Sequence, residues 1–180
     1  MSDYIRSRSG STYFFTVVTY KRQPILCLDE SRAALREAIK DVREERPYEV
    51  KAWVLLPNHL HCIWELPEGD ADYSIRWALV KKGFIKRVKG RIETPEPNQS
   101  RLLRRRESAV WQRRFWKHQI RDEAHLLKHC DYIHYNPVKH GLAASPKDWK
   151  YSTFHRYVEE GLYPEDWGGG GIDLPGMGGE

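Results

Sequence analysis

Residues 48–66, YEVKAWVLLPNHLHCIWEL, hold the pattern that decides the fold. The runs YEVKAWVLL (48–56) and HLHCIWEL (59–66) have the length and the apolar and aromatic content of strands. Pro57-Asn58 stands between them and is typical of a turn. We therefore predict two antiparallel strands that are neighbours in a sheet.

The flanking segments extend this pair. TYFFTVVTY (12–20) predicts a buried strand, and the ambiguous stretch 109–120 permits a fourth. Helical spacing of apolar residues predicts helices over about 29–46, 72–88, 122–135 and 152–158. Asn136-Pro137 disfavours continuation of the third helix beyond Asn136. The order β-α-β-β-α-β-α indicates an α+β fold, a central antiparallel sheet with helices on one face.

Length and composition narrow the class of protein. The 180 residues suit one domain with a tail, and a 40% apolar, 31% charged composition is globular. The three cysteines are an odd number without a CxxC pair, which favours a reducing compartment over a disulfide framework. No run approaches the ~18 apolar residues of a membrane span. We expect one domain over 1–167 and a flexible, Gly-rich tail over 168–180.

Positive charge is concentrated in residues 81–121. They hold 14 Lys or Arg against three acidic residues, and aromatic residues are interleaved with them. Such a region is either a solvated basic face or a surface for a polyanion, of which nucleic acid is the commonest. The candidate DNA-binding residues are Lys81, Lys82, Arg87, Arg104, Arg105, Arg106, Trp111, Arg113, Arg114, Phe115 and His118. We expect the proline-containing stretch 93–108 to be a mobile loop.

His59-Leu60-His61 is a candidate half of a metal site. Alternate side chains of a strand share a face, so both imidazoles point the same way. Two neutral imidazoles side by side can bind one metal ion. The alternative is a pair of ordinary polar residues on an open strand face.

Tyr132 and Asn136 form a second candidate constellation. They are four residues apart and therefore share one face of the expected helix. The amide oxygen of Asn136 is a hard ligand suited to Mg²⁺ or Mn²⁺, and it would complement the two histidines. Tyr132 beside such a metal is a possible nucleophile. The alternative is a half-buried core aromatic.

A zinc site is not expected. His125 and His129 are four residues apart on the same helix and can bind zinc as a pair. No third ligand follows at the spacing of a zinc finger. A zinc-dependent regulator would contain stoichiometric Zn²⁺ after purification.

Several segments together resemble the REP-associated tyrosine transposases, members of the HUH superfamily of single-strand nucleases. The similarity extends over about residues 4–167. The segments that carry it are YFFTVVTYKRQPIL (13–26), PNHLHCIWELPEGD (57–70), YSIRWALVKKGFIKR (73–87), WQRRFWKHQIRDE (111–123), YIHYNPVKHGL (132–142) and DWKYSTFHRY (148–157).

The resemblance implies a ferredoxin-like or RRM-like HUH nuclease core. His59 and His61 match the two HUH histidines, Asn136 the third metal ligand, and Tyr132 the catalytic tyrosine. It implies a metal-dependent enzyme, with Mg²⁺ or Mn²⁺, that cleaves and joins single-stranded DNA at REP-like hairpins through a 5′-phosphotyrosine.

We expect a monomer rather than a dimer, since one chain can supply His59, His61 and Tyr132, although some relatives in the superfamily exchange the tyrosine helix between subunits. We also expect no membrane association, and the bacterial cytoplasm, at the nucleoid, as the location. The alternative function is a non-catalytic RRM-like protein that binds single-stranded or hairpin nucleic acid. Such a protein would tolerate Tyr132→Phe, whereas the enzyme would lose cleavage.

Overall fold

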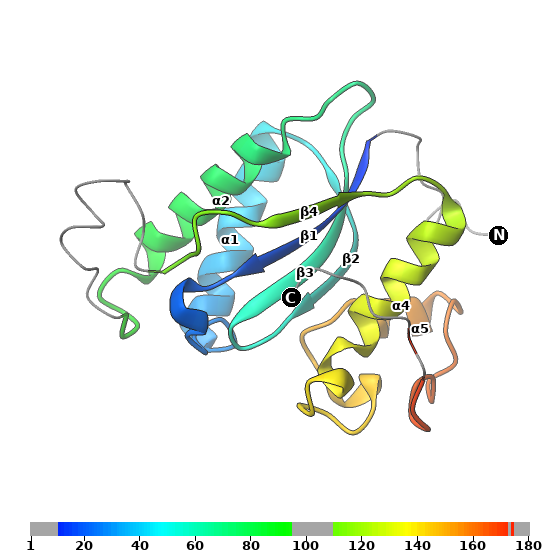
Figure 1. Cartoon of the computed structure of the whole chain (residues 1–180). Coiled ribbons are helices and arrows are strands. Elements are labelled where there is room, and N and C mark those ends of the chain that lie inside the picture. The colour runs from blue at the N-terminus through cyan, green and yellow to red at the C-terminus, as the bar shows by residue number, and fades with distance from the viewer. Residues whose placement is uncertain (1–10, 95–109, 173, 175–180) are drawn as a thin grey trace.

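The sheet is built around the strand pair at the centre of the sequence. The structure is a computed structural model and describes residues 11–94, 110–172 and 174. In it, β2 (Glu49–Leu55) and β3 (His59–Glu65) are antiparallel, as predicted. β1 (Thr12–Val18) pairs with the other side of β3, and β4 (Trp116–Gln119) pairs with β1. The strand order is therefore β2-β3-β1-β4, all antiparallel (Figure 1).

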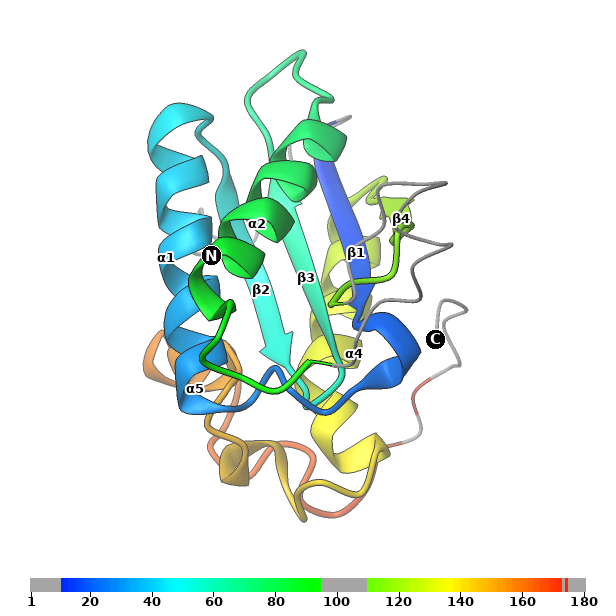
Figure 2. The ribbon, with the colours of Figure 1, turned by 90° about the vertical axis from the view of Figure 1, so that its left-hand side faces the viewer.

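Helices cover both faces of this sheet. α1 (Asp29–Glu45) and α2 (Tyr73–Val88) lie side by side on one face (Figure 2). α4 (Glu123–Lys139) and the short α5 (Phe154–Glu159) lie on the other. The expectation of helices on one face was wrong, because both faces of the central strands are apolar. The α+β class with flanking helices is confirmed.

Strand β1 shows how two cores arise from one run of residues. Tyr13, Phe15 and Val17 pack in the core beneath α1 and α2. Phe14, which points the other way, packs beneath α4. Alternation along the strand therefore supplies both cores, and it places Phe14 beside His61 and Tyr132.

The ambiguous stretch 109–120 forms a strand only at its end. β4 has four residues, 116–119. Before it, Trp111 makes an isolated bridge to Thr19 and is buried against Phe84, with ring centroids 5.1 Å apart. The chain thus packs against α2 before it joins the sheet. Most of the expected loop 93–108 lies outside the described residues.

Helix α4 continues beyond the predicted end. The amide of His125 donates to the side chain of Asp122, which caps the first turn. Pro137 lies inside the helix. The end comes at Gly141, whose φ of 68° suits glycine, where Gly141 N–H donates to Val138 O and Leu142 N–H to Pro137 O. This pair of bonds is a Schellman motif and explains why the helix ends there rather than at Asn136.

Short helices complete the structure. They are the 3₁₀ turns η2 (Tyr20–Arg22) and η3 (Pro146–Asp148).

In the described part of the expected tail, Ile172 N–H donates to the hydroxyl of Tyr135 at 3.2 Å. The division into a domain over 1–167 and a tail over 168–180 stays a prediction. Among the described residues, no helix combines the length and the apolar character that crossing a membrane requires.

Candidate active site

The histidine pair lies on the α4 side of strand β3. His59 is 4% exposed and His61 is fully buried, and their ring centroids are 4.9 Å apart. Leu60, between them, is buried in the core under α1 and α2. The strand geometry predicted from the sequence is therefore correct, and both imidazoles face the helix that carries Tyr132.

The Nδ1 atom of each imidazole takes part in a hydrogen bond. His59 Nδ1 lies 2.6 Å from Asn58 Oδ1, and because this oxygen can only accept, Nδ1 donates. His61 Nδ1 lies 2.8 Å from the hydroxyl of Thr16 on β1. In the neutral His59 ring, Nε2 therefore keeps its lone pair. A histidine whose ring is oriented by a hydrogen bond at one nitrogen is typical of a metal ligand.

Tyr132 lies against this pair. Its ring centroid is 5.3 Å from that of His61, and the two rings are nearly perpendicular, at 67°. Asn136 follows one helical turn later and is fully buried. Phe14 packs beneath both aromatic groups, 5.6 Å from His61 and 6.0 Å from Tyr132. The structure thus brings a tyrosine to the histidine pair within a single chain.

The last turn of α4 covers the site. Lys139 Nζ donates to the Tyr132 hydroxyl at 3.5 Å and lies 5.0 Å from the centre of its ring. The ring of His140, the C-cap residue, lies 5.1 Å from that of His59. Both covering residues are exposed, whereas Tyr132 is only 4% exposed.

The donors present fit a divalent cation. His59 Nε2, His61 Nε2 and Asn136 Oδ1 are all buried atoms. Two imidazole nitrogens and one amide oxygen make a mixed set that leaves coordination positions for water or phosphate oxygens.

The candidate DNA-binding residues on α2 lie away from this site, whereas His118 of β4 lies on its side of the sheet. Lys81, Lys82 and Arg87 are on α2, across the sheet from the histidine pair. Arg87 pairs with Asp41 of α1 at 2.5 Å. Lys81 donates to Gln112 O at 2.9 Å, and burial lowers its pKa to about 8.

The aromatic candidates need correction. Trp111 is only 3% exposed, so it is a core residue rather than a platform for bases. Phe115 is half-buried, 5.7 Å from Phe15 and 6.2 Å from Trp77, in the same core. Arg113 and Arg114 are exposed beside them. Arg104, Arg105 and Arg106 lie outside the described residues.

Two residues near the histidine pair were missed. Trp116 of β4 is 38% exposed and lies 5.6 Å from Phe14, so it is on the same face as the histidine pair. Strand alternation could have found it, because Trp116 and His118 are two residues apart. Lys139 was missed because the helix was expected to end before it.

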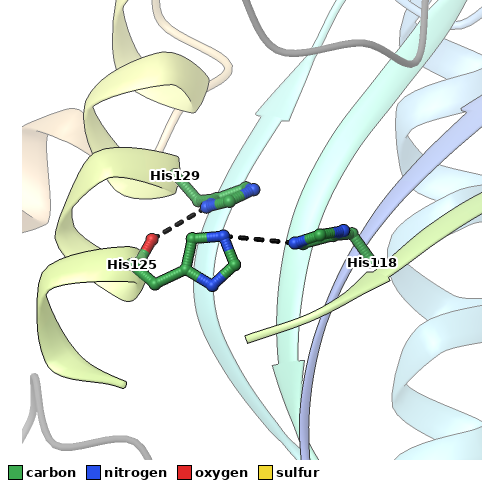
Figure 3. Close-up of side chains that lie close together, drawn as sticks. All are labelled: His118, His125 and His129. Carbon is green, nitrogen blue, oxygen red and sulfur yellow. Dashed lines mark hydrogen bonds between the residues drawn. The ribbon is translucent and has the colours of Figure 1, made fainter. Parts of the chain in front are cut away.

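His118 is on the same face as Trp116, next to the helical histidines. Its Nε2 lies 3.1 Å from His125 Nε2, and His129 is adjacent (Figure 3). The sequence offers no third histidine at finger-like spacing, and the fold brings His118 to the pair from a strand instead.

Comparisons with known proteins place the chain in a family. No protein-family model matches it. An Escherichia coli protein named REP-associated tyrosine transposase is 44% identical over 175 residues, 97% of this chain and 95% of that protein. A Haemophilus influenzae relative assigned to the same family is 44% identical over 170 residues, 94% of each chain. A solved REP-associated tyrosine transposase bound to a REP hairpin matches with a TM-score of 0.77 and 43% identity, covering 100% of this chain and 98% of that one.

The similarities show both the class of enzyme and the family to which this chain belongs. The chain has the α+β fold of a solved tyrosine transposase and is an enzyme of this class. It belongs to the REP-associated tyrosine transposase family.

Proposed function

We propose that this protein is a metal-dependent endonuclease and strand transferase that acts on single-stranded DNA beside REP-like hairpins. The observation that carries the proposal is the position of Tyr132. Its ring centroid lies 5.3 Å from that of His61, and it is on a helix face that also holds Asn136. A tyrosine beside two imidazoles and an amide oxygen has the composition of a metal-assisted phosphodiester transesterase. The solved relative supports hairpin DNA as the substrate, because its structure contains a REP hairpin.

Tyr132 is the nucleophile in this proposal. Its hydroxyl oxygen attacks the phosphorus and loses its proton as the new O–P bond forms. The bond from phosphorus to the 3′ oxygen breaks, and that oxygen leaves as a free 3′-OH after taking up a proton. The DNA remains attached to Tyr132 as a 5′-phosphotyrosine, and attack by another 3′-OH reverses the step and joins strands.

Lys139 supports this chemistry electrostatically. Its ammonium group already donates to the Tyr132 hydroxyl, at 3.5 Å. A cation at this distance stabilises the negative charge that develops on the phenolic oxygen. Lys139 therefore acts on the reacting atom itself.

His59, His61 and Asn136 would hold one Mg²⁺ or Mn²⁺ ion. Such an ion, when bound, polarises and positions the scissile phosphate. The hydrogen bonds of Asn58 and Thr16 to the two imidazoles keep the rings oriented for this role.

A monomer is sufficient for this reaction. Tyr132 and the histidine pair meet within one chain, which supports a tyrosine that acts in cis. Trp116 offers an exposed aromatic ring on the same face, where an unpaired base could stack. Action on chromosomal DNA in the bacterial cytoplasm stays a prediction.

The deciding experiment is a cleavage assay with Tyr132→Phe. End-labelled oligonucleotides carrying a hairpin with single-stranded flanks are incubated with the protein and Mg²⁺ or Mn²⁺. Wild type should form a covalent adduct that Tyr132→Phe does not form. Tyr135→Phe is the matched control, because Tyr135 is on the same helix and should retain adduct formation.

The same assay separates the enzyme from a binding module. Salt-sensitive binding by all three proteins, without an adduct from any of them on a panel of palindromes from the host genome, would support the non-catalytic alternative. Adduct formation by Tyr132→Phe would remove Tyr132 from its role.

A further inference from the structure

Three histidines from two elements form a cluster beside the candidate active site. His118 is on β4, and His125 and His129 occupy successive turns of α4 (Figure 3). One ligating nitrogen from each lies within 4.8 Å of the others. The cluster is separate from the His59–His61 pair, since Phe14 packs between His129 and His61, at 5.1 and 5.6 Å.

The distance between two of the nitrogens is close to that of a tetrahedral metal site. Zn–N bonds of 2.0–2.1 Å at tetrahedral angles place two ligand nitrogens about 3.3–3.4 Å apart. His118 Nε2 and His125 Nε2 are 3.1 Å apart. Two histidines at positions i and i+4 on one helix face are a frequent zinc pair, and His118 adds the third imidazole.

The hydrogen bonds present fix the tautomers of two of these histidines. His129 Nδ1 lies 2.8 Å from the carbonyl oxygen of His125 and donates to it, so the neutral ring has its lone pair on Nε2. His125 Nδ1 accepts from Arg121 N–H at 3.2 Å, so His125 Nε2 carries the proton and donates to His118 Nε2. Metal binding at His125 Nε2 would require the other tautomer, with the proton on Nδ1 and the hydrogen bond from Arg121 N–H given up.

Packing holds the rings in place. Trp116 stacks on His118 at 5.6 Å with an angle of 3° between the planes, and the His118 and His129 rings are also nearly parallel, at 15°. Burial lowers the pKa of His129 to about 4 and also lowers the pKa of His118. Both rings are therefore neutral near pH 7, the form that binds metals.

We propose that His118, His125 and His129 bind one transition metal ion of the zinc class as a site distinct from the active site. An all-imidazole donor set suits Zn²⁺, Ni²⁺, Cu²⁺ or Co²⁺ rather than Mg²⁺. Three ligands leave the fourth position for a water molecule. The ion links edge strand β4 to the first two turns of α4, the helix that continues into Tyr132.

Zinc content measures the site directly. Full-length, metal-free protein is dialysed against micromolar Zn²⁺, and the bound metal is counted per chain. His118→Gln and His125→Gln should each bind one equivalent less than wild type. His155→Gln is the matched control, because His155 belongs to neither histidine set and bonds Trp149 O at 2.9 Å. It should match wild type.

A further variant distinguishes this site from the proposed active site. His59→Gln removes a candidate active-site ligand and should keep the equivalent that His125→Gln loses. Co²⁺ gives an independent readout, since the visible absorption of tetrahedral Co²⁺ should appear in wild type and in His59→Gln and be absent from His125→Gln. Circular dichroism of the metal-free proteins checks that each variant is folded.

Hydrogen exchange tests the linking role. Zn²⁺ should slow amide exchange in residues 116–130 of wild type and leave His125→Gln unchanged. Equal zinc content in wild type, His118→Gln and His125→Gln would overturn the proposal, as would wild type without bound zinc. Loss of the same equivalent in His59→Gln would instead assign the metal to the other histidine pair, and the proposal would fail.

Discussion

Lys139→Met removes a positive charge that contacts the hydroxyl of the candidate nucleophile. The ammonium lies 3.5 Å from the Tyr132 oxygen, so full negative charge on that oxygen would be stabilised by about 1.2 kcal/mol in bulk water and about 5 kcal/mol at an effective dielectric constant of ~20. Lys139 is exposed, so the value for water is the better guide. At 1.36 kcal/mol per tenfold change, DNA cleavage should slow about eightfold.

Single-turnover cleavage with saturating protein isolates this effect from DNA binding. Lys128→Met is the control, because Lys128 is an exposed lysine of the same helix and its loss changes the net charge equally. Lys139→Arg should recover most of the rate, since it keeps the charge. An unchanged rate in Lys139→Met, or an equal loss in Lys128→Met, would refute the electrostatic role of Lys139.

Three further predictions concern stability and binding. Burial lowers the pKa of His134 to about 3, against ~6.5 in the unfolded chain. As the pH falls from 7 to 5, the unfolded chain therefore binds the proton first, and the free energy of unfolding drops by about 2 kcal/mol. Denaturant titrations should show a smaller drop in His134→Gln, and an identical drop would contradict this. Asp122→Ala removes the cap on His125 N–H and should cost about 1 kcal/mol of stability, whereas Glu123→Ala should cost less. Trp116→Ala should weaken single-stranded DNA binding, measured by fluorescence anisotropy, by about 1–3 kcal/mol, and Trp116→Phe should retain most of it; equal affinity in all three proteins would exclude stacking there.

Local sequence patterns predicted the strands and the helix starts well. The strand pair around Pro57-Asn58 and the start of α4 after Asp122 follow from turn and capping residues, whose effects act over a few positions. The helices on both faces were not predicted, although the nearly continuous apolar run of β1 is typical of a strand that is covered on both faces. Phe14 and Phe15 are adjacent and equally apolar, yet they pack in different cores.

In the candidate site, too, the features that depend on one element could be predicted, whereas those that depend on two elements could not. The shared face of His59 and His61, and that of Tyr132 and Asn136, are properties of single elements and could be predicted. The grouping of His118 with His125 depends on the path of the chain between β4 and α4. No spacing rule for that path exists in the sequence, so the three-histidine cluster was not expected.

The part of α4 beyond its predicted end contributes a residue, Lys139, to the candidate site. If the helix ended at Asn136, the residues after it would turn away from the helix axis. The position of Lys139 relative to Tyr132 would then not be fixed by the helix. Because the helix continues through Pro137 to Lys139, the ammonium lies seven residues, about two turns, from Tyr132 and therefore on the same face. Gly141 permits this by closing the helix two residues later with its left-handed backbone. Gly141→Ala should thus loosen the last turn and slow cleavage through Lys139, although Gly141 touches no group of the site.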